Sequence, residues 1–293
     1  DAHSDEIGYQ VTGIEPDGQL VVRELGGFFG RYYLGHVMLV HLTDGRSVGA
    51  VLGLPAGWDR PGFTWPKPLS TLSEAADAYV GTDSRAATEE LGIHVGDFLT
   101  IPKTYRPLLG SDFQVRSIDD RAGDTALIEA VRALGPHFAD EHPGRQLTFV
   151  WATREELGLE GAAAYAAQAA KLGQEPDVVF AVDMFVSSES PLETGRYGDQ
   201  TLGDGFVVRA ADLSHIDSPA DTARVVALAR AHHIAVQYGV TGGGNDSAVY
   251  TRYGADAIAL GWPTKYSHSP AEQSNTRDID GLARICTVLA EDW

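Results

Sequence analysis

The chain has 293 residues, of which 43% are hydrophobic and 22% are charged. This length and composition predict a globular protein with one large domain or two ordinary ones. The formal net charge of −19 argues against a nucleic-acid partner, because acidic side chains repel phosphates.

The apolar runs are too short to span a bilayer and no signal peptide is visible. We therefore expect no membrane partner and a cytoplasmic location, although the chain opens at Asp1 rather than Met, as it would after removal of a leader. A single cysteine, Cys286, excludes an internal disulfide framework and a thiolate metal cluster. Any bound metal must therefore use imidazole and carboxylate ligands.

The first segment places His3 and Asp5 two residues apart, so on an extended chain both side chains point to the same side. This spacing suits a metal-bound histidine and a carboxylate that orients it. A surface strand end explains the pattern equally well. Because a ligand strand normally lies inside a sheet, we expect that residues preceding Asp1 are missing from the printed chain.

Residues 8–115 have mostly β character. Asp17-Gly18 and Asp44-Gly45 indicate tight hairpins, residues 61–68 a loop, and residues 86–91 a short helix. We interpret the segment as a small β-barrel-like domain inserted into the chain. The strands that flank the hairpins are expected at residues 9–11, 20–22 and 37–40.

Asp119 precedes a helix predicted over residues 124–134, with Gly135 at its end. The apolar face of this helix is expected to contain Leu127, Ile128, Val131 and Leu134. Asp119 thus lies at a strand-to-helix junction, where α/β proteins place chemistry. The alternative is that Asp119 or Asp120 only caps the helix.

Beyond Asp119, strands alternate with helices, which predicts an α/β fold with helices on both faces of a mainly parallel sheet. Residues 1–7 and 116–293 would form this domain around the inserted segment 8–115. Strands are expected at residues 147–152, 178–182, 206–209, 235–240 and 257–261, and helices at 161–172, 220–232 and 279–291.

Acidic residues or a histidine follow three of these strands. Glu155 and Glu156 follow residues 147–152, Asp183 follows 178–182, and His268 lies beyond 257–261. Adjacent glutamates are also common in a first helical turn, where the helix dipole favours them. Taken together, the residues favour a metal site at the carboxyl edge of the sheet, with imidazole and carboxylate ligands that suit zinc, cobalt or manganese.

Six motifs resemble, in their order, the glutamyl-aminopeptidase or TET-type family of co-catalytic metallo-aminopeptidases. The resemblance covers essentially the whole chain. The motifs are AHSDEIG at residues 2–8, DDRAG at 119–123, REELGLEGA at 154–162, VDM at 182–184, GGGNDSA at 242–248 and PTKYSHSPAE at 263–272.

The resemblance implies a site for two divalent ions in which Asp119 bridges the metals. It implies that His3 and Asp183 bind one ion, and that Glu156 and His268 bind the other. Glu155 would then be the general base and Asp5 would orient His3. Gly243, Gly244 and Asp246 would shape the substrate pocket.

The implied activity is hydrolysis of the first bond of a peptide, by a homo-oligomer ranging from a dimer to a dodecamer. Arg154 stands where many relatives have glutamine, so substrate preference cannot be carried over. A two-metal deacylase of small amides and a non-catalytic peptide-binding protein are the alternatives. A glycoside hydrolase would need no histidine ligands, so metal dependence would exclude it.

Overall fold

The computed structural model describes residues 1–27, 30–54, 61–62, 64, 76–191 and 199–293, and the chain divides into two compact units. The barrel unit contains Glu6–Thr104 and His268–Pro270, and the sheet unit contains Asp1–Asp5, Tyr105–Ser267 and Ala271–Trp293. Residues 105–115, expected in the inserted segment, therefore belong to the sheet unit. Most of the predicted loop at 61–68 lies outside the described residues.

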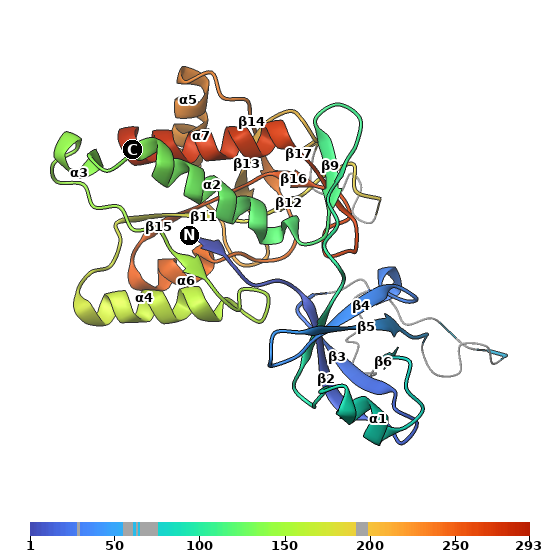
Figure 1. Cartoon of the computed structure of the whole chain (residues 1–293). Coiled ribbons are helices and arrows are strands. Elements are labelled where there is room, and N and C mark those ends of the chain that lie inside the picture. The colour runs from blue at the N-terminus through green and yellow to red at the C-terminus, as the bar shows by residue number, and fades with distance from the viewer. Residues whose placement is uncertain (28–29, 55–60, 63, 65–75, 192–198) are drawn as a thin grey trace. The chain divides into compact units, whose positions relative to one another are not determined.

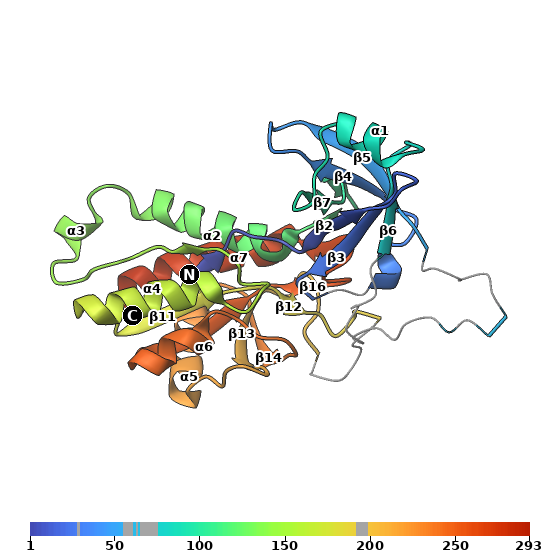
Figure 2. The same cartoon turned by 90° about the horizontal axis from the view of Figure 1, so that it is seen from below.

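The barrel unit is a closed barrel with the strand order β2-β3-β6-β5-β4-β7. The predicted hairpins are present, because Ile14 pairs with Leu20 around the first turn and His41 pairs with Ser47 around the second. The short helix α1 (Arg85–Glu90) lies beside the strands (Figure 2). The strands are β2 (Gly8–Ile14), β3 (Leu20–Leu25), β4 (Val37–His41), β5 (Ser47–Leu52), β6 (Ala76–Tyr79) and β7 (Phe98–Thr100).

The sheet unit is built on four strands in the order β11-β15-β13-β14: β11 (Val178–Val182), β15 (Asp256–Gly261), β13 (Phe206–Ala211) and β14 (Val236–Val240). The pairs β11–β15 and β13–β14 are parallel, whereas β13 and β15 are antiparallel. The expected mainly parallel sheet is thus confirmed, with one reversed pair at its centre.

The amino-terminal strand β1 (Ala2–His3) continues this arrangement. It pairs in parallel with β10 (Trp151–Ala152), and Val182 N donates a hydrogen bond to Asp1 O on its other side. β10 covers only the last two residues of the strand predicted over residues 147–152. The remaining strands are β8 (Arg106–Pro107), β9 (Asp112–Val115), β12 (Phe185–Val186), β16 (Pro263–Thr264) and β17 (Glu272–Asn275).

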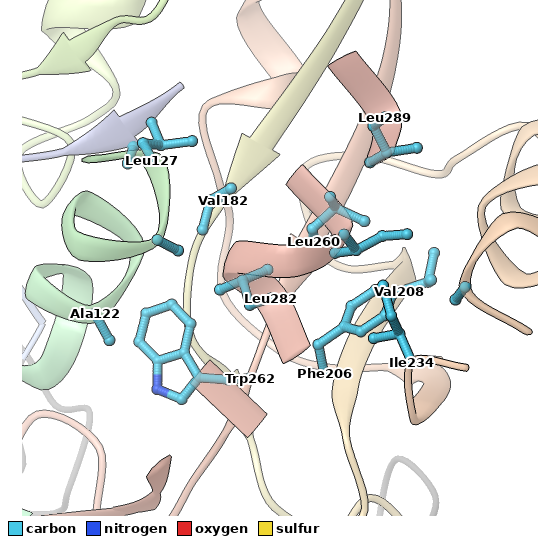
Figure 3. Packing of buried hydrophobic residues seen from close by; sticks show 14 of the residues in the cluster. Ala122, Leu127, Val182, Phe206, Val208, Ile234, Leu260, Trp262, Leu282 and Leu289 are labelled. Carbon is cyan, nitrogen blue, oxygen red and sulfur yellow. The ribbon is translucent and has the colours of Figure 1, made fainter. Parts of the chain in front are cut away.

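Helices cover both faces of the four-stranded sheet (Figure 1). Strand side chains alternate between the faces, so Val182, Val208 and Leu260 pack in one cluster with residues of α2, α5 and α7 (Figure 3). Val179 and Ala257 pack on the other face, with α4 and α6. The helices are α2 (Ile118–Leu134), α3 (Phe138–Glu141), α4 (Glu160–Leu172), α5 (Pro219–Ala231), α6 (Ser247–Tyr250) and α7 (Thr276–Asp292).

The buried face of α2 differs from the predicted one. Ile128 and Val131 are each 42% exposed, while Ala126 and Ala130 are fully buried. The helix begins at Ile118, earlier than predicted, and its small alanines face the core cluster shared with α7. Of the predicted residues, Leu127 is buried in the core cluster, whereas the smaller Ala126 and Ala130 take the buried positions expected for Ile128 and Val131.

Within the described residues, the structure contains no helix with both the length and the apolar character of a membrane-spanning segment.

Candidate metal centre

Asp119 and Asp120 stand at the start of α2 but do not have helical backbone angles. Ser117 occupies the N-cap position without a side-chain cap hydrogen bond. Both aspartates instead meet His3: Asp119 Oδ1 lies 3.1 Å from His3 Nε2, and Asp120 Oδ2 accepts a hydrogen bond from His3 N at 2.9 Å. The start of α2 is therefore joined to β1 through these two carboxylates.

Neighbouring residues hold this junction in place. Glu272 Oε2 accepts a 2.6 Å hydrogen bond from Ile118 N, directly before Asp119. Gly123 lies so close to Asp120 that a Cβ added there would meet Asp120 Oδ1 at 2.2 Å. A glycine is thus required one turn into the helix, because any larger residue would displace the carboxylate that holds His3.

His3 and Asp5 are also brought together. His3 is 2% exposed, and its Nδ1 lies 3.5 Å from Asp5 Oδ1. Asp5 in turn accepts hydrogen bonds from Glu155 N at 3.1 Å and from Glu156 N at 3.4 Å. One carboxylate thereby orients the imidazole ring and the backbone of the adjacent glutamates, in the manner of a residue that supports a metal ligand.

Glu155 and Glu156 lie in a turn, and α4 does not begin until Glu160. They are therefore not part of a first helical turn, which was the alternative interpretation. Glu155 Oε2 lies 3.8 Å from His3 Nε2, and the Glu155 side chain is 12% exposed.

Asp183 follows β11 directly, and its Oδ2 accepts a 2.9 Å hydrogen bond from Arg209 Nη1. A Cβ at Gly261 would meet Asp183 O at 2.2 Å, so β15 approaches this residue closely only because a glycine stands there. His3, Asp119 and Asp183 are all buried and each offers a donor atom within 4.8 Å of the other two. These three residues can hold a metal ion.

Asp119 also belongs to a second set of candidate metal ligands. Asp119 and Glu156 offer oxygen atoms within 4.8 Å of each other. His268 belongs with residues 268–270 to the barrel unit, so its part in this set stays a prediction.

The electrostatics of the cluster favour a cation. Burial, together with the nearby charge of Asp183, raises the pKa of Glu155 to about 10. Burial also raises the pKa of Asp183 to about 6, although Arg209 opposes this shift. Burial alone would lower the pKa of His3, but its contacts with the carboxylates of Asp119 and Asp5 outweigh burial and raise the pKa above that of an ordinary imidazole.

A divalent cation would stabilise the ionised form of these neighbouring carboxyl groups, because a positive charge lowers the pKa of each of them. It would return Glu155 to the ionised form that a general base needs. One imidazole and several carboxylates without a thiolate form a donor set that fits zinc, cobalt or manganese. The residues present therefore fit the expected group.

The loop between β14 and α6 contains Gly243, Gly244 and Asp246. Gly243 has a φ of +80°, a conformation that glycine adopts without strain. Asp246 is 5% exposed, and its Oδ1 is buried without a hydrogen-bond partner. Burial raises the pKa of Asp246 to about 6; the charge of His3 opposes this shift, and the charge of Asp183 adds to it.

Three residues that hold the candidate metal ligands in place were not predicted from the sequence: Asp120, Arg209 and Glu272. Asp120 was considered only as a helix cap, and Glu272 stood unremarked at the end of a quoted motif. Arg209 carried the clearest signal, since a charged residue inside a buried strand needs a partner.

Comparison with known proteins places this site in context. The sequence profile described as M42 glutamyl aminopeptidase matches residues 1–285. The lysyl aminopeptidase of Pyrococcus furiosus is 28% identical over 295 residues, which cover 99% of this chain and 80% of the relative. The glutamyl aminopeptidase of Lactococcus lactis is 28% identical over 95% of this chain and 75% of the relative.

Two of the solved structures that are similar to this chain are also those of peptidases. The TET1 peptidase of Pyrococcus horikoshii, described as able to assemble into a tetrahedron or a large octahedral shell, superimposes with a TM-score of 0.84 at 32% identity. That match covers 100% of this chain and 82% of the other. An aminopeptidase from Desulfurococcus kamchatkensis has a TM-score of 0.84 at 26% identity, over 100% of this chain and 78% of that one.

Proposed function

Because the chain belongs to the M42 glutamyl aminopeptidase family, and is therefore a metallo-aminopeptidase, we propose that it uses two divalent ions and a glutamate general base. The observation that carries the proposal is the buried group of His3, Asp119 and Asp183, whose donor atoms lie within 4.8 Å of one another. We assign His3 and Asp183 to one ion, Glu156 and His268 to the other, and Asp119 to both. Zinc or cobalt, and manganese after them, suit these ligands.

The ions, when bound, would activate a water molecule and polarise the scissile carbonyl. Glu155 would accept the proton of that water and pass it to the leaving amine. Asp5 would keep His3 and the backbone of Glu155 in register, because it contacts both. Asp246 would provide a buried negative charge for the free amino end of the peptide, and Gly243 and Gly244 would leave room beside it.

A panel of aminoacyl amides, run together with metal analysis, tests this function. We expect two ions per chain, activity that exhaustive chelation abolishes, and recovery with zinc or cobalt. Matched N-acylated amides should not be cleaved, because they lack the free amino end. Cleavage of only the acylated set would favour a two-metal deacylase, and undiminished hydrolysis after chelation would contradict the proposal.

We also propose a homo-oligomer in the cytoplasm, ranging from a dimer to a dodecamer. Support comes from the relative from Pyrococcus horikoshii, which is described as forming large shells. The barrel unit, predicted as the inserted domain over residues 8–115, would contribute to assembly and to access to the site. Light scattering that gives only a mass near 31.4 kDa would contradict this proposal.

A further inference from the structure

The guanidinium group of Arg209, on β13, is 3% exposed and contacts two segments of the site. Its Nη1 donates hydrogen bonds to Asp183 Oδ2 at 2.9 Å and to Met184 O at 3.0 Å. Its Nη2 donates to Gly242 O at 3.3 Å and to Gly244 O at 2.9 Å. One side chain thus joins the aspartate that follows β11 to the loop that follows β14.

Asp212 supports the same connection from the end of β13. Its Oδ2 lies 2.9 Å from Arg209 Nε and also accepts a hydrogen bond from Asn245 Nδ2. Ser214 Oγ accepts a 3.2 Å hydrogen bond from Asn245 N, and Leu213 N donates to Gly243 O at 3.1 Å. The glycine loop is therefore tied to β13 at several points directly before Asp246.

The shape of arginine explains why this position needs it. A guanidinium is planar and presents five N–H donors in a fixed fork, and here it faces two carboxylates and three carbonyl oxygens. A lysine ammonium has three donors at one point and cannot reach both segments.

We propose that Arg209 is a positioning residue that holds the ion-binding Asp183 and the loop carrying Asp246 in one fixed relation. The inference rests on the proposed function, because it assigns Asp183 to an ion and Asp246 to the substrate. Under it, Asp183, assigned to an ion that acts on the scissile carbonyl, and Asp246, assigned to the free amino end of the same residue, are aligned through one buried side chain. That side chain touches neither substrate nor ion.

The competing interpretation is that Arg209 only neutralises two buried carboxylates and so stabilises the fold. Three variants separate these roles. Arg209→Lys keeps the charge but loses the fork, and Asp212→Asn loosens the loop without touching Asp183. Asp278→Asn is the matched control: Asp278 is fully buried and accepts hydrogen bonds from Gly203 N and Gly205 N, away from the network described above.

For Arg209→Lys we expect kcat/KM for an aminoacyl amide to fall about 10²-fold, the loss that misplacement by about 1 Å can cause. Both ions should remain, but the visible spectrum of the cobalt-loaded protein should change, because Asp183 is no longer held. For Asp212→Asn, KM should rise about tenfold while kcat and the cobalt spectrum stay close to those of the wild type. Asp278→Asn should lower Tm and leave KM, kcat and the spectrum unchanged.

If Arg209→Lys and Asp212→Asn lower Tm as the control does, with wild-type KM, kcat and cobalt spectrum, Arg209 is structural and the inference is wrong. Should Arg209→Lys fail to fold, Asp212→Asn decides alone, and an unchanged KM overturns the inference. A wild-type protein that binds no ions or cleaves no aminoacyl amide overturns the proposed function itself, and the inference with it.

Discussion

The core of the barrel unit is formed by apolar side chains from its six strands, among them Leu20, Met38 and Leu99. In the described part of that unit, Asp97 is the one buried charged residue, and it accepts a hydrogen bond from His94 N three residues away. The sheet unit has an apolar core as well, but it also buries many charged side chains. These are His3, Arg116, Asp119, Asp120, Asp124, Asp183, Arg209, Asp217, Asp246, Glu272 and Asp278.

The sheet unit, which contains the candidate metal ligands His3, Asp119 and Asp183, is thus the unit that buries most of the charge. Burying a charge is unfavourable unless it is paired or bound to a metal. The core of the barrel unit depends almost entirely on apolar packing, because the described part of that unit buries one charged residue. In the sheet unit, most of the charges at the candidate metal centre follow a strand or lie at the start of α2, where backbone and glycine contacts hold them.

The largest effect is expected at the glutamate pair. Glu155→Gln keeps the shape of the side chain and removes proton acceptance, so turnover should fall by about 10²–10⁴-fold while metal content is unchanged. Glu156→Gln should instead lose an ion, because an amide oxygen is a weaker ligand than a carboxylate. Zinc titration of each variant during peptide hydrolysis measures both effects.

The Glu156→Gln variant serves as the control, since excess metal should restore part of its activity. Rescue of Glu155→Gln by zinc, with none for Glu156→Gln, would mean that the two roles are reversed.

Truncation of either apolar core should lower stability to a similar extent, whatever the function of the unit. Leu20 in the barrel and Leu282 in α7 are both fully buried, so Leu20→Ala and Leu282→Ala should each lower the free energy of unfolding by about 2–5 kcal/mol. Urea denaturation provides the measurement. Leu109 is 96% exposed, and Leu109→Ala should change stability by less than about 0.5 kcal/mol. An equal loss in all three variants would show that the cores are not as described.

Metal affinity should depend on pH because of the buried acids of the sheet unit. Burial raises the pKa of Asp183 to about 6, so below that pH a proton must leave the carboxyl group before an ion binds. Asp183 alone should then lower zinc affinity by about tenfold per pH unit below about pH 6. Because the pKa of His3 is raised as well, affinity should continue to increase above pH 6.

Calorimetric titrations between pH 5 and pH 7.5, each in two buffers with different ionisation heats, would report affinity and proton release together. The same dependence of affinity on pH below and above pH 6 would show that Asp183 is already ionised at pH 5.

The smallest effect is expected for charges on the surface of the same unit. Glu129 and Arg132 form an ion pair one turn apart on α2, with side chains 50% and 70% exposed. Glu129→Ala should change the free energy of unfolding by no more than about 0.5 kcal/mol, because water already screens the pair. Thermal unfolding at low and high salt would check it, and a loss above about 1 kcal/mol would contradict this view of the surface pair.

Local pattern determined much of the architecture. Strand β11 has the predicted bounds of 178–182, and α7 spans 276–292 against the predicted 279–291. The strand follows from a short continuous apolar run, and the helix from the spacing of its apolar residues. His3, Asp119, Asp183 and the glutamate pair were also chosen from the sequence, because each stands at the end or start of an element.

Tertiary structure alone decided how these residues meet. His3 N and Asp120 Oδ2 are 117 positions apart in the chain, and Arg209 and Asp183 are separated by 26. No local repeat encodes such pairs, since they depend on which strands lie side by side and in which direction. For the same reason, the sequence does not predict the antiparallel pairing of β13 with β15 or the burial of the alanine face of α2. The periodicity of apolar residues predicts which side chains face the interior, whereas packing between distant segments decides which residues they contact there.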